Sequence, residues 1–258
     1  MINTPARIER REYKYLVSAP LAQAIRQDIQ PFCELDPFAR QSPDSAYRID
    51  SCYLDTPDLA FFHASENEQL DRFKIRARTY PDTGARWVFL EVKRRINDVI
   101  LKTRGRIHQE QLAGLLLSSP KAVLARTDEG QRDAVAAFLD LVHRYGARPL
   151  VTVRYSREAW ASQIDDYARV TFDRQILGRV QRELSLDQAE EDWRYIDSTE
   201  LQKTPRSLIL VELKFTQAVP SWMSHMVQRY DLLRTAFSKY GSAVRAWHRS
   251  PYLLTSTF

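Results

Sequence analysis

The sequence has 258 residues, of which 44% are hydrophobic, 11% aromatic and 28% charged. That composition excludes a disordered chain and supplies enough apolar material for a folded core. Seven glycines leave little for Gly-rich phosphate loops, and neither GxxxxGK[ST] nor GxGxxG occurs. Cys33 and Cys52 have neither the spacing of a zinc site nor that of a CxxC motif. The charged N-terminal residues do not resemble a signal peptide, and no run of about 18 apolar residues is present to form a transmembrane helix. We therefore expect a soluble, cytoplasmic domain, and the net charge of +5 indicates an anionic partner.

Periodic spacing of apolar residues predicts the elements of the first half of the chain. The expected strands are Arg7–Val17, Tyr47–Leu54, Leu70–Tyr80, Arg86–Arg94 and Val99–His108. The expected helices are Pro20–Gln30 and Leu59–Ser65. Turn sequences join the last three strands, which indicates an antiparallel meander.

The second half of the chain begins with a predicted helical insert at about 109–146, with helices at Gln109–Leu117 and Gly130–Tyr145. Strands are then expected at Leu150–Trp160, Tyr167–Ile176, Gly178–Leu184 and Ser207–Thr216. A helical segment at about 220–248, with a break, ends the pattern. About eight strands without regularly alternating helices predict a single α+β domain. In it, a closed antiparallel β-barrel forms a tunnel, and the helices pack outside.

Several predicted strands have one apolar and one charged face, because successive side chains point to opposite sides of a strand. In the strand Leu70–Tyr80, Phe73 and Ile75 share one face, and Lys74, Arg76 and Arg78 share the other. The same alternation aligns charged residues on five further strands: Arg10, Glu12 and Lys14; Glu91 and Lys93; Lys102, Arg104 and Arg106; Arg169 and Asp173; Glu212 and Lys214.

A charged strand face is ordinarily the solvated side of a half-buried sheet. Here the faces are mainly basic, and the pattern Glu-x-Lys recurs at Glu91–Lys93 and Glu212–Lys214. If they line a tunnel, its lumen must hold an anion, because an unpaired buried ion costs several kcal/mol. The few carboxylates would supply oxygen ligands for Mg²⁺ or Mn²⁺, so a phosphate chain with a divalent metal fits this pattern.

Ordered segments across about residues 7–241 resemble the VTC (vacuolar transporter chaperone) domain. They are Arg10-x-Glu12-x-Lys14-Tyr15, Lys74-x-Arg76-x-Arg78-x-Tyr80, Phe89-x-Glu91-x-Lys93, Lys102-x-Arg104, Tyr155-x-Arg157-x-Ala159-Trp160, Arg169-x-x-x-Asp173, Val211-Glu212-x-Lys214 and Phe237-x-Lys239-Tyr240. The resemblance implies the eight-stranded tunnel of the triphosphate tunnel metalloenzymes. It also implies the activity of the best-understood VTC members, which extend polyphosphate with the γ-phosphate of ATP and a divalent metal.

The resemblance also implies roles for individual residues. Phosphate binding is implied for Lys14, Arg76, Arg78, Lys93, Lys102, Arg157, Arg169 and Lys239, and metal binding for Glu212. The shared strand faces add Arg104, Lys214, Arg10 and Lys74 as further substrate-binding candidates, and Glu91, Asp173 and Glu12 as further metal ligands. Arg10 stands where the superfamily's ExExK signature has its first glutamate, which argues against simple two-metal hydrolysis of triphosphate.

The function expected from the sequence is an ATP-dependent polyphosphate polymerase that uses Mg²⁺ or Mn²⁺. The alternatives are a hydrolase of triphosphate or nucleoside triphosphates and a non-catalytic module that binds polyphosphate or nucleotides. Nucleic acid is not an expected partner, because the charged faces are expected to carry few aromatics besides Tyr80. Any export of the product across a membrane would require a separate membrane protein.

Overall fold

The computed structural model describes residues 10–84, 86–97, 99–165, 167–186, 191–197, 208–216 and 218–248. Its contacts divide the chain into two units. Unit 1 comprises residues 1–47, 156–175 and 197–237, and unit 2 comprises residues 48–155, 176–196 and 238–258. Two long strands, β7 (Arg148–Ser162) and β8 (Ala168–Val180), contribute residues to both units. The prediction of a single domain stays a prediction.

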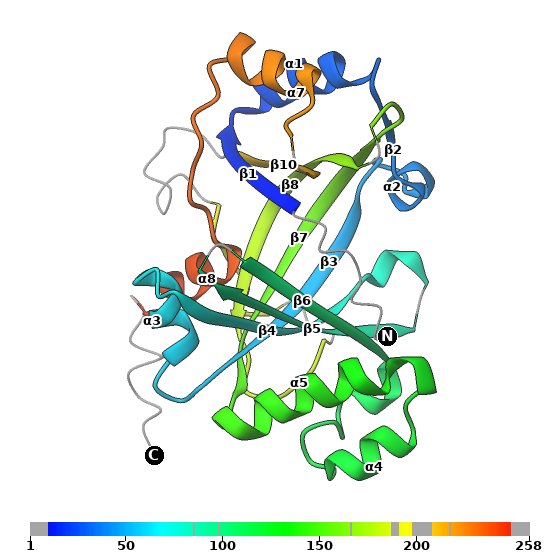
Figure 1. Cartoon of the computed structure of the whole chain (residues 1–258), viewed down its shortest axis with the longest axis vertical. Coiled ribbons are helices and arrows are strands. Elements are labelled where there is room, and N and C mark those ends of the chain that lie inside the picture. The colour runs from blue at the N-terminus through cyan, green and yellow to red at the C-terminus, as the bar shows by residue number, and fades with distance from the viewer. Residues whose placement is uncertain are drawn as a thin grey trace, which may run out of the picture. The chain divides into compact units, whose positions relative to one another are not determined.

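Unit 1 is built on β1 (Arg10–Val17), which pairs antiparallel with β10 (Ile209–Thr216). Next to β10 lies β8, and the short β2 (Cys33–Leu35) pairs with the end of β7. Helices α1 (Ala19–Ile29) and α7 (Ser221–Arg229) pack against each other (Figure 1). A further short helix is α2 (Pro37–Gln41), whose first turn is capped by the Asp36 carboxylate.

The core of unit 1 follows from helical and strand periodicity. Ala22, Ile25 and Ile29 recur on one face of α1 and are fully buried. They pack in one cluster with apolar side chains from β1, β8, β10 and α7: Tyr15, Val17, Val170, Phe172, Val211, Leu213, Phe215 and Met223. The charged residues of β1 and β10 take the alternate strand positions, so the apolar core leaves their polar face free for other contacts.

Unit 2 contains an antiparallel meander made of β4 (Asp71–Thr79), β5 (Trp87–Ile96) and β6 (Val99–His108). β3 (Tyr47–Asp55) pairs with β4 and β7, while β9 (Arg194–Tyr195) pairs with β8. The 3₁₀ turn η1 (Pro81–Thr83) precedes Gly84, whose φ of +65° lies in the left-handed region that favours glycine.

Helices cover the apolar face of this meander. α5 (Arg132–Tyr145) buries Val135, Phe138, Leu139 and Val142 and lies against β5 and β6 (Figure 1). At Gly105 of β6 an added Cβ would lie 2.9 Å from Val135 Cγ2, so this close approach of strand and helix requires glycine. The other helical elements of unit 2 are α3 (Ala60–Glu66), η2 (Gln109–Gln111), α4 (Pro120–Ala125), η3 (Glu129–Gln131) and α8 (Lys239–His248).

The α+β architecture is confirmed, but a closed barrel is not observed. The strand order is β1-β10-β8-β7-β3-β4-β5-β6, and no hydrogen-bonded pairing between β1 and β6 is found within the described ranges. The sheet is therefore not closed by hydrogen bonds. Alternation of residue types identifies the faces of a strand, but closure depends on strand tilt and stagger, which that alternation does not encode.

Two predicted elements are corrected by the structure. The helix expected at Gln109–Leu117 is only the 3₁₀ turn η2, after which Leu112 and Leu115 enter the core from turns. The separate strand expected at Gly178–Leu184 is the end of β8, which continues to Val180. The predicted break in the C-terminal helical segment is confirmed, since α7 ends at Arg229 and α8 begins at Lys239.

Candidate functional site

The charged face of unit 1 gathers six side chains, which we call cluster 1: Glu12, Lys14, Arg157, Asp173, Glu212 and Lys214. Strand register places Lys14 of β1 opposite Glu212 of β10, and Glu212 opposite Thr171 of β8. The alternation read from the sequence thus brings these residues together within unit 1.

Glu212 is the centre of cluster 1 and is only 5% exposed. Its carboxylate lies 3.0 Å from Lys214 Nζ, 3.5 Å from Arg157 Nη2 and 4.0 Å from Lys14 Nζ. A buried carboxylate needs such partners, because an uncompensated buried charge costs several kcal/mol. Glu212 consequently fixes the positions of three cations.

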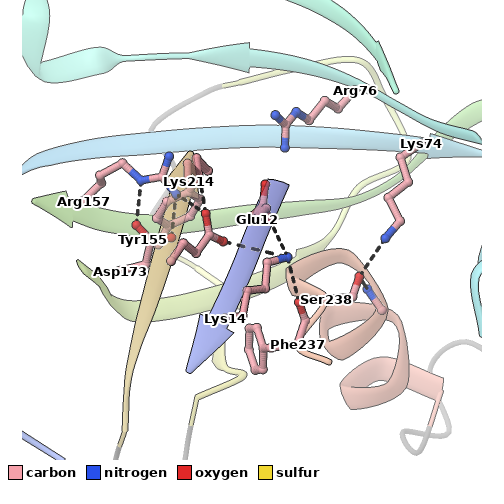
Figure 2. Close-up of polar contacts among 12 residues, drawn as sticks. Glu12, Lys14, Lys74, Arg76, Tyr155, Arg157, Asp173, Lys214, Phe237 and Ser238 are labelled. Carbon is pink, nitrogen blue, oxygen red and sulfur yellow. Dashed lines mark hydrogen bonds and ion pairs between the residues drawn. The ribbon is translucent and has the colours of Figure 1, made fainter. Parts of the chain in front are cut away.

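Arg157 is held by a second carboxylate. Its Nε and Nη2 donate to the two oxygens of Asp173 at 2.6 and 2.7 Å, and Asp173 is completely buried (Figure 2). This two-point contact sets the plane of the guanidinium more firmly than a single hydrogen bond would. Asp173 therefore positions Arg157.

Lys14 is held from two sides, as Figure 2 shows. Its Nζ lies 3.0 Å from the Glu12 carboxylate and donates to the carbonyl oxygen of Phe237 at 3.1 Å. The backbone carbonyl of Lys14 also accepts from the Thr235 N–H at 2.8 Å. The segment before α8 thus helps to position a β1 side chain.

The charged face of unit 2 forms a second group, which we call cluster 2: Arg76 and Arg78 of β4, Glu91 of β5, and Lys102 and Arg104 of β6. Register pairs Arg76 with Glu91 and Glu91 with Arg104. Glu91, at 2% exposure, accepts from Arg76 Nε at 2.7 Å and lies 2.9 Å from Lys102 Nζ and 3.5 Å from Arg104 Nε. Cluster 2 therefore contains four cations around one carboxylate.

The electrostatics of cluster 2 follow from this excess of positive charge. Burial alone would raise the pKa of Glu91, but Arg76, Arg78 and Lys102 hold that pKa well below its ordinary value. For Lys102, burial lowers the pKa in spite of the attraction of Glu91. Glu91 therefore stays ionised, and the cations around it still outnumber it.

Hydroxyl groups position the two arginines of β4. Arg76 Nη1 donates to the Tyr53 hydroxyl at 3.0 Å, and Arg78 donates to the Ser51 and Tyr155 hydroxyls at 3.0 and 3.3 Å. Burial alone would raise the pKa of Tyr53, but Arg76 and Arg78 lower it to about 8. Because these hydroxyls are mostly uncharged at neutral pH, they orient Arg76 and Arg78 without neutralising the positive charge of the two guanidinium groups.

Further lysines of unit 2 lie on α8 and along the same strand face. Lys239, 9% exposed, places its Nζ 4.8 Å from the centre of the Tyr155 ring. Lys74 Nζ donates to the Ser238 hydroxyl at 3.2 Å, next to the start of α8 (Figure 2). Register aligns Lys74 with Lys93 and Lys93 with Lys102, so these three lysines form one row across β4, β5 and β6.

Two predicted site residues lie apart from these contacts. Arg169 is exposed on β8, opposite Lys214 of β10 in the register. Arg10 stands opposite Thr216 at the start of β1, and its side chain lies outside the described part of the structure. The phosphate- and metal-binding roles assigned to all these residues stay predictions.

The sequence analysis missed two kinds of residue. Ser51 and Tyr53 alternate on β3 and contact the arginines of cluster 2, but no charge marked them. Trp87 and Phe89 alternate with Glu91 on β5, and register pairs them with His108 and Arg106. The expectation that this charged face carries few aromatics besides Tyr80 is therefore wrong, although the same alternation could have placed both rings there.

A divalent cation fits cluster 1 only together with other ligands. The described residues contain no group of three or more His, Cys, Asp or Glu side chains placed to hold a metal ion. Both oxygens of Asp173 accept from Arg157, through Nε and Nη2, which leaves Glu212 as the central carboxylate. Mg²⁺ is ordinarily bound by one or two carboxylates plus substrate phosphates and water, so Glu212 fits a metal that arrives with a phosphate ligand.

Of the helices that the structure describes, none has the length and apolar composition required to cross a membrane.

Comparison with known proteins shows that the VTC domain family model matches residues 9–248, which is most of the chain. No curated protein matches the sequence. A solved structure titled as a candidate adenylate cyclase from Bacillus halodurans aligns with a TM-score of 0.48 and 11% identity, over 88% of this chain and 92% of that chain. The PH1819 protein from Pyrococcus horikoshii OT3 aligns with a TM-score of 0.45 and 11% identity, over 92% and 99%. Structural similarity of this extent carries no argument about activity.

Proposed function

Because the chain belongs to the VTC domain family, we propose that it is a polyphosphate polymerase that transfers the γ-phosphate of ATP to a growing polyphosphate chain. The observation that carries this proposal is the composition of cluster 2, where four cations are oriented by one carboxylate and several hydroxyls. An oriented excess of positive charge suits a ligand with several negative charges along its length. The tunnel expected from the charged strand faces remains part of the proposal.

In this proposal cluster 2 binds phosphate groups. Arg76 and Arg78 would donate to phosphate oxygens in the forked geometry of the guanidinium. Lys102, Arg104 and Lys239 would supply further positive charge, and Lys93 and Lys74 would extend the basic surface along the strands. Phosphoryl transfer depends mainly on such positioning and charge stabilisation, because its transition state is loose and spreads charge over the equatorial oxygens.

Cluster 1 would hold the phosphates at the point of transfer. Glu212, together with phosphate oxygens, would hold Mg²⁺ or Mn²⁺, which when bound neutralises charge on the phosphates. Lys14, Arg157 and Lys214 surround Glu212 and would donate to the transferred group, and Arg169 would add charge from β8. Glu12 and Asp173 would act as positioning residues, because each carboxylate already holds a cation.

The chemical step needs no base from the protein. A terminal oxygen of the polyphosphate chain forms a bond to the γ-phosphorus of ATP, while the bond from that phosphorus to the β–γ bridging oxygen breaks. ADP leaves with the bonding electron pair, so atoms and charge balance without a proton transfer. The attacking oxygen is already ionised, which agrees with reliance on cations rather than a Ser, His and Asp arrangement.

The test is to incubate the purified chain with ATP and Mn²⁺ or Mg²⁺ and to separate the products on a gel that resolves polyphosphate. Lengthening chains with release of ADP support the proposal. Free phosphate without chains indicates a hydrolase, and ATP binding without turnover indicates a binding module; either result would overturn the polymerase proposal. Arg94→Ala, which breaks an exposed ion pair with Asp71 on β4, serves as the control for nonspecific effects.

A further inference from the structure

The charged face of β5 and β6 continues beyond cluster 2 into aromatic residues. Trp87 and Phe89 precede Glu91 at intervals of two residues on β5, so all three side chains share one face. Register places Arg104, Arg106 and His108 of β6 opposite Glu91, Phe89 and Trp87 respectively. A single face of this strand pair therefore changes along its length from ionic to aromatic.

Two arginines of β6 place their guanidinium groups over rings of β5. The Arg104 guanidinium carbon is 3.8 Å from the centre of the Phe89 ring, and that of Arg106 is 4.4 Å from the Trp87 ring. The His108 ring lies 4.0 Å from the Trp87 ring, with 35° between their planes. Cation–π contacts of this kind restrict the side chains and so reduce the entropy lost when a ligand binds.

An open cavity of about 320 Å³ lies at the aromatic end of this face, lined by Arg86, His108, Gln109 and Glu110. At the start of η2 the backbone N–H of His108 donates to the Gln111 side chain at 2.9 Å, which holds the backbone at this position. The exposed histidine ring, which lies against Trp87, offers a flat surface, and the neighbouring amide and carboxylate offer hydrogen-bonding groups.

These groups match the chemistry of a nucleobase better than that of a phosphate chain. A base can stack on the His108 ring, and its exocyclic amine can donate to the Glu110 carboxylate. A phosphate chain has no flat face for stacking, and the charges of Arg86 and Glu110 in the lining offset each other. The cavity is therefore suited to the uncharged end of a nucleotide.

The spacing also agrees with a nucleotide. His108 is four residues beyond Arg104 on β6, a separation of about 13 Å at the ordinary rise of a strand. An extended nucleoside triphosphate spans a distance of this order between its phosphates and its base. We propose that the cavity at His108 is the base subsite for the nucleoside triphosphate donor, an inference that rests on the proposed function because cluster 2 must bind the phosphates of the same molecule.

The experiment measures the affinities of ATP and of inorganic tripolyphosphate, which lacks a base, by calorimetric titration of the full chain. His108→Gln removes the ring but keeps a polar side chain, whereas His108→Phe keeps an aromatic ring and removes the polar atoms. We expect H108Q to lower the affinity for ATP about tenfold and to leave the affinity for tripolyphosphate unchanged. H108F should bind ATP within about twofold of the unmodified chain, because a stacking surface remains. The matched control, His143→Gln, changes an exposed histidine on α5.

The base subsite is overturned if H108Q leaves the affinity for ATP unchanged, or if it lowers the affinity for tripolyphosphate by the same factor as that for ATP. It is also overturned if H108F loses as much ATP affinity as H108Q does. The last result would show that a stacking surface at position 108 does not supply the affinity, because H108F keeps an aromatic ring. An unmodified chain that binds neither ATP nor tripolyphosphate would instead contradict the proposed function, together with the subsite that rests on it. Binding of both ligands without a response to H108Q would overturn the subsite alone.

Discussion

Clusters 1 and 2 arise from the same strand alternation but differ in charge balance. In cluster 1 the carboxylates of Glu12, Asp173 and Glu212 match Lys14, Arg157 and Lys214 in number. In cluster 2 Glu91 alone stands among Arg76, Arg78, Lys102 and Arg104. A balanced cluster holds its cations in fixed places, while an unbalanced one retains a net attraction for anions. We therefore expect cluster 2 to dominate phosphate affinity and cluster 1 to dominate turnover.

The largest expected effect is on turnover, from Glu212→Gln. The change removes the carboxylate that orders Lys14, Arg157 and Lys214 and that would hold a metal beside phosphate. We expect polyphosphate synthesis to fall by about 100-fold or more, which is the scale for losing one preorganised charge-stabilising group. Tripolyphosphate affinity should be retained, as measured by titration.

Glu34→Gln is the matched control in unit 1, because Glu34 forms an exposed ion pair with Arg40. That variant should keep its full rate of synthesis. Synthesis by E212Q at the unmodified rate would remove the assigned role of Glu212.

The next effect is on stability, from Glu91→Gln. Removing the one carboxylate leaves the cations of cluster 2 unpaired, so we expect a loss of about 3 kcal/mol in the free energy of unfolding. Tripolyphosphate should stabilise this variant more than the unmodified chain, because the ligand replaces the missing negative charge. Urea denaturation with and without tripolyphosphate measures both quantities.

Asp140→Asn provides the comparison, since it breaks an exposed ion pair with Arg144 on α5 and should cost less than about 1 kcal/mol. If E91Q is no less stable than D140N, the ion pairs of the buried Glu91 carboxylate do not contribute the stability assigned to them.

Removing either arginine of β4 should weaken phosphate binding. Arg76→Ala and Arg78→Ala each remove hydrogen bonds from a charged donor, and we expect tripolyphosphate affinity to fall about tenfold to 100-fold. Titration calorimetry measures the change, with Arg94→Ala as the control. Unchanged affinity in both variants would show that this face of β4 does not bind phosphate.

The smallest effect is a pH-dependent one at Tyr53. The pKa of Tyr53 is lowered from 10.0 to about 8, so the folded state favours the ionised phenolate. The stabilisation it supplies is absent below about pH 8, grows as the pH rises, and is complete above about pH 10. Relative to Tyr53→Phe, the unmodified chain should gain about 2 kcal/mol in unfolding free energy over this range. Parallel pH profiles of the two proteins would contradict the assignment.

Much of the fold was predictable because alternation directly reports which strand positions are apolar. The register of β4, β5 and β6 then brings together Arg76, Glu91 and Arg104, as their shared face predicted. The predicted closed barrel was not confirmed, and closure depends on strand tilt, which alternation does not encode. The helix predicted at Gln109–Leu117 was wrong, because its apolar residues enter the core from turns. The charge balance of cluster 1 was not predictable, since its residues come from β1, β7, β8 and β10, which lie far apart in the sequence.

The most direct test is one titration series: tripolyphosphate added without metal to the unmodified chain, to Arg76→Ala and to Glu212→Gln. We expect the R76A variant to lose at least about tenfold in tripolyphosphate affinity and the E212Q variant to bind as tightly as the unmodified chain. Equal affinities for all three proteins, or a loss confined to E212Q, would contradict the assignment of phosphate affinity to cluster 2 and of turnover to cluster 1.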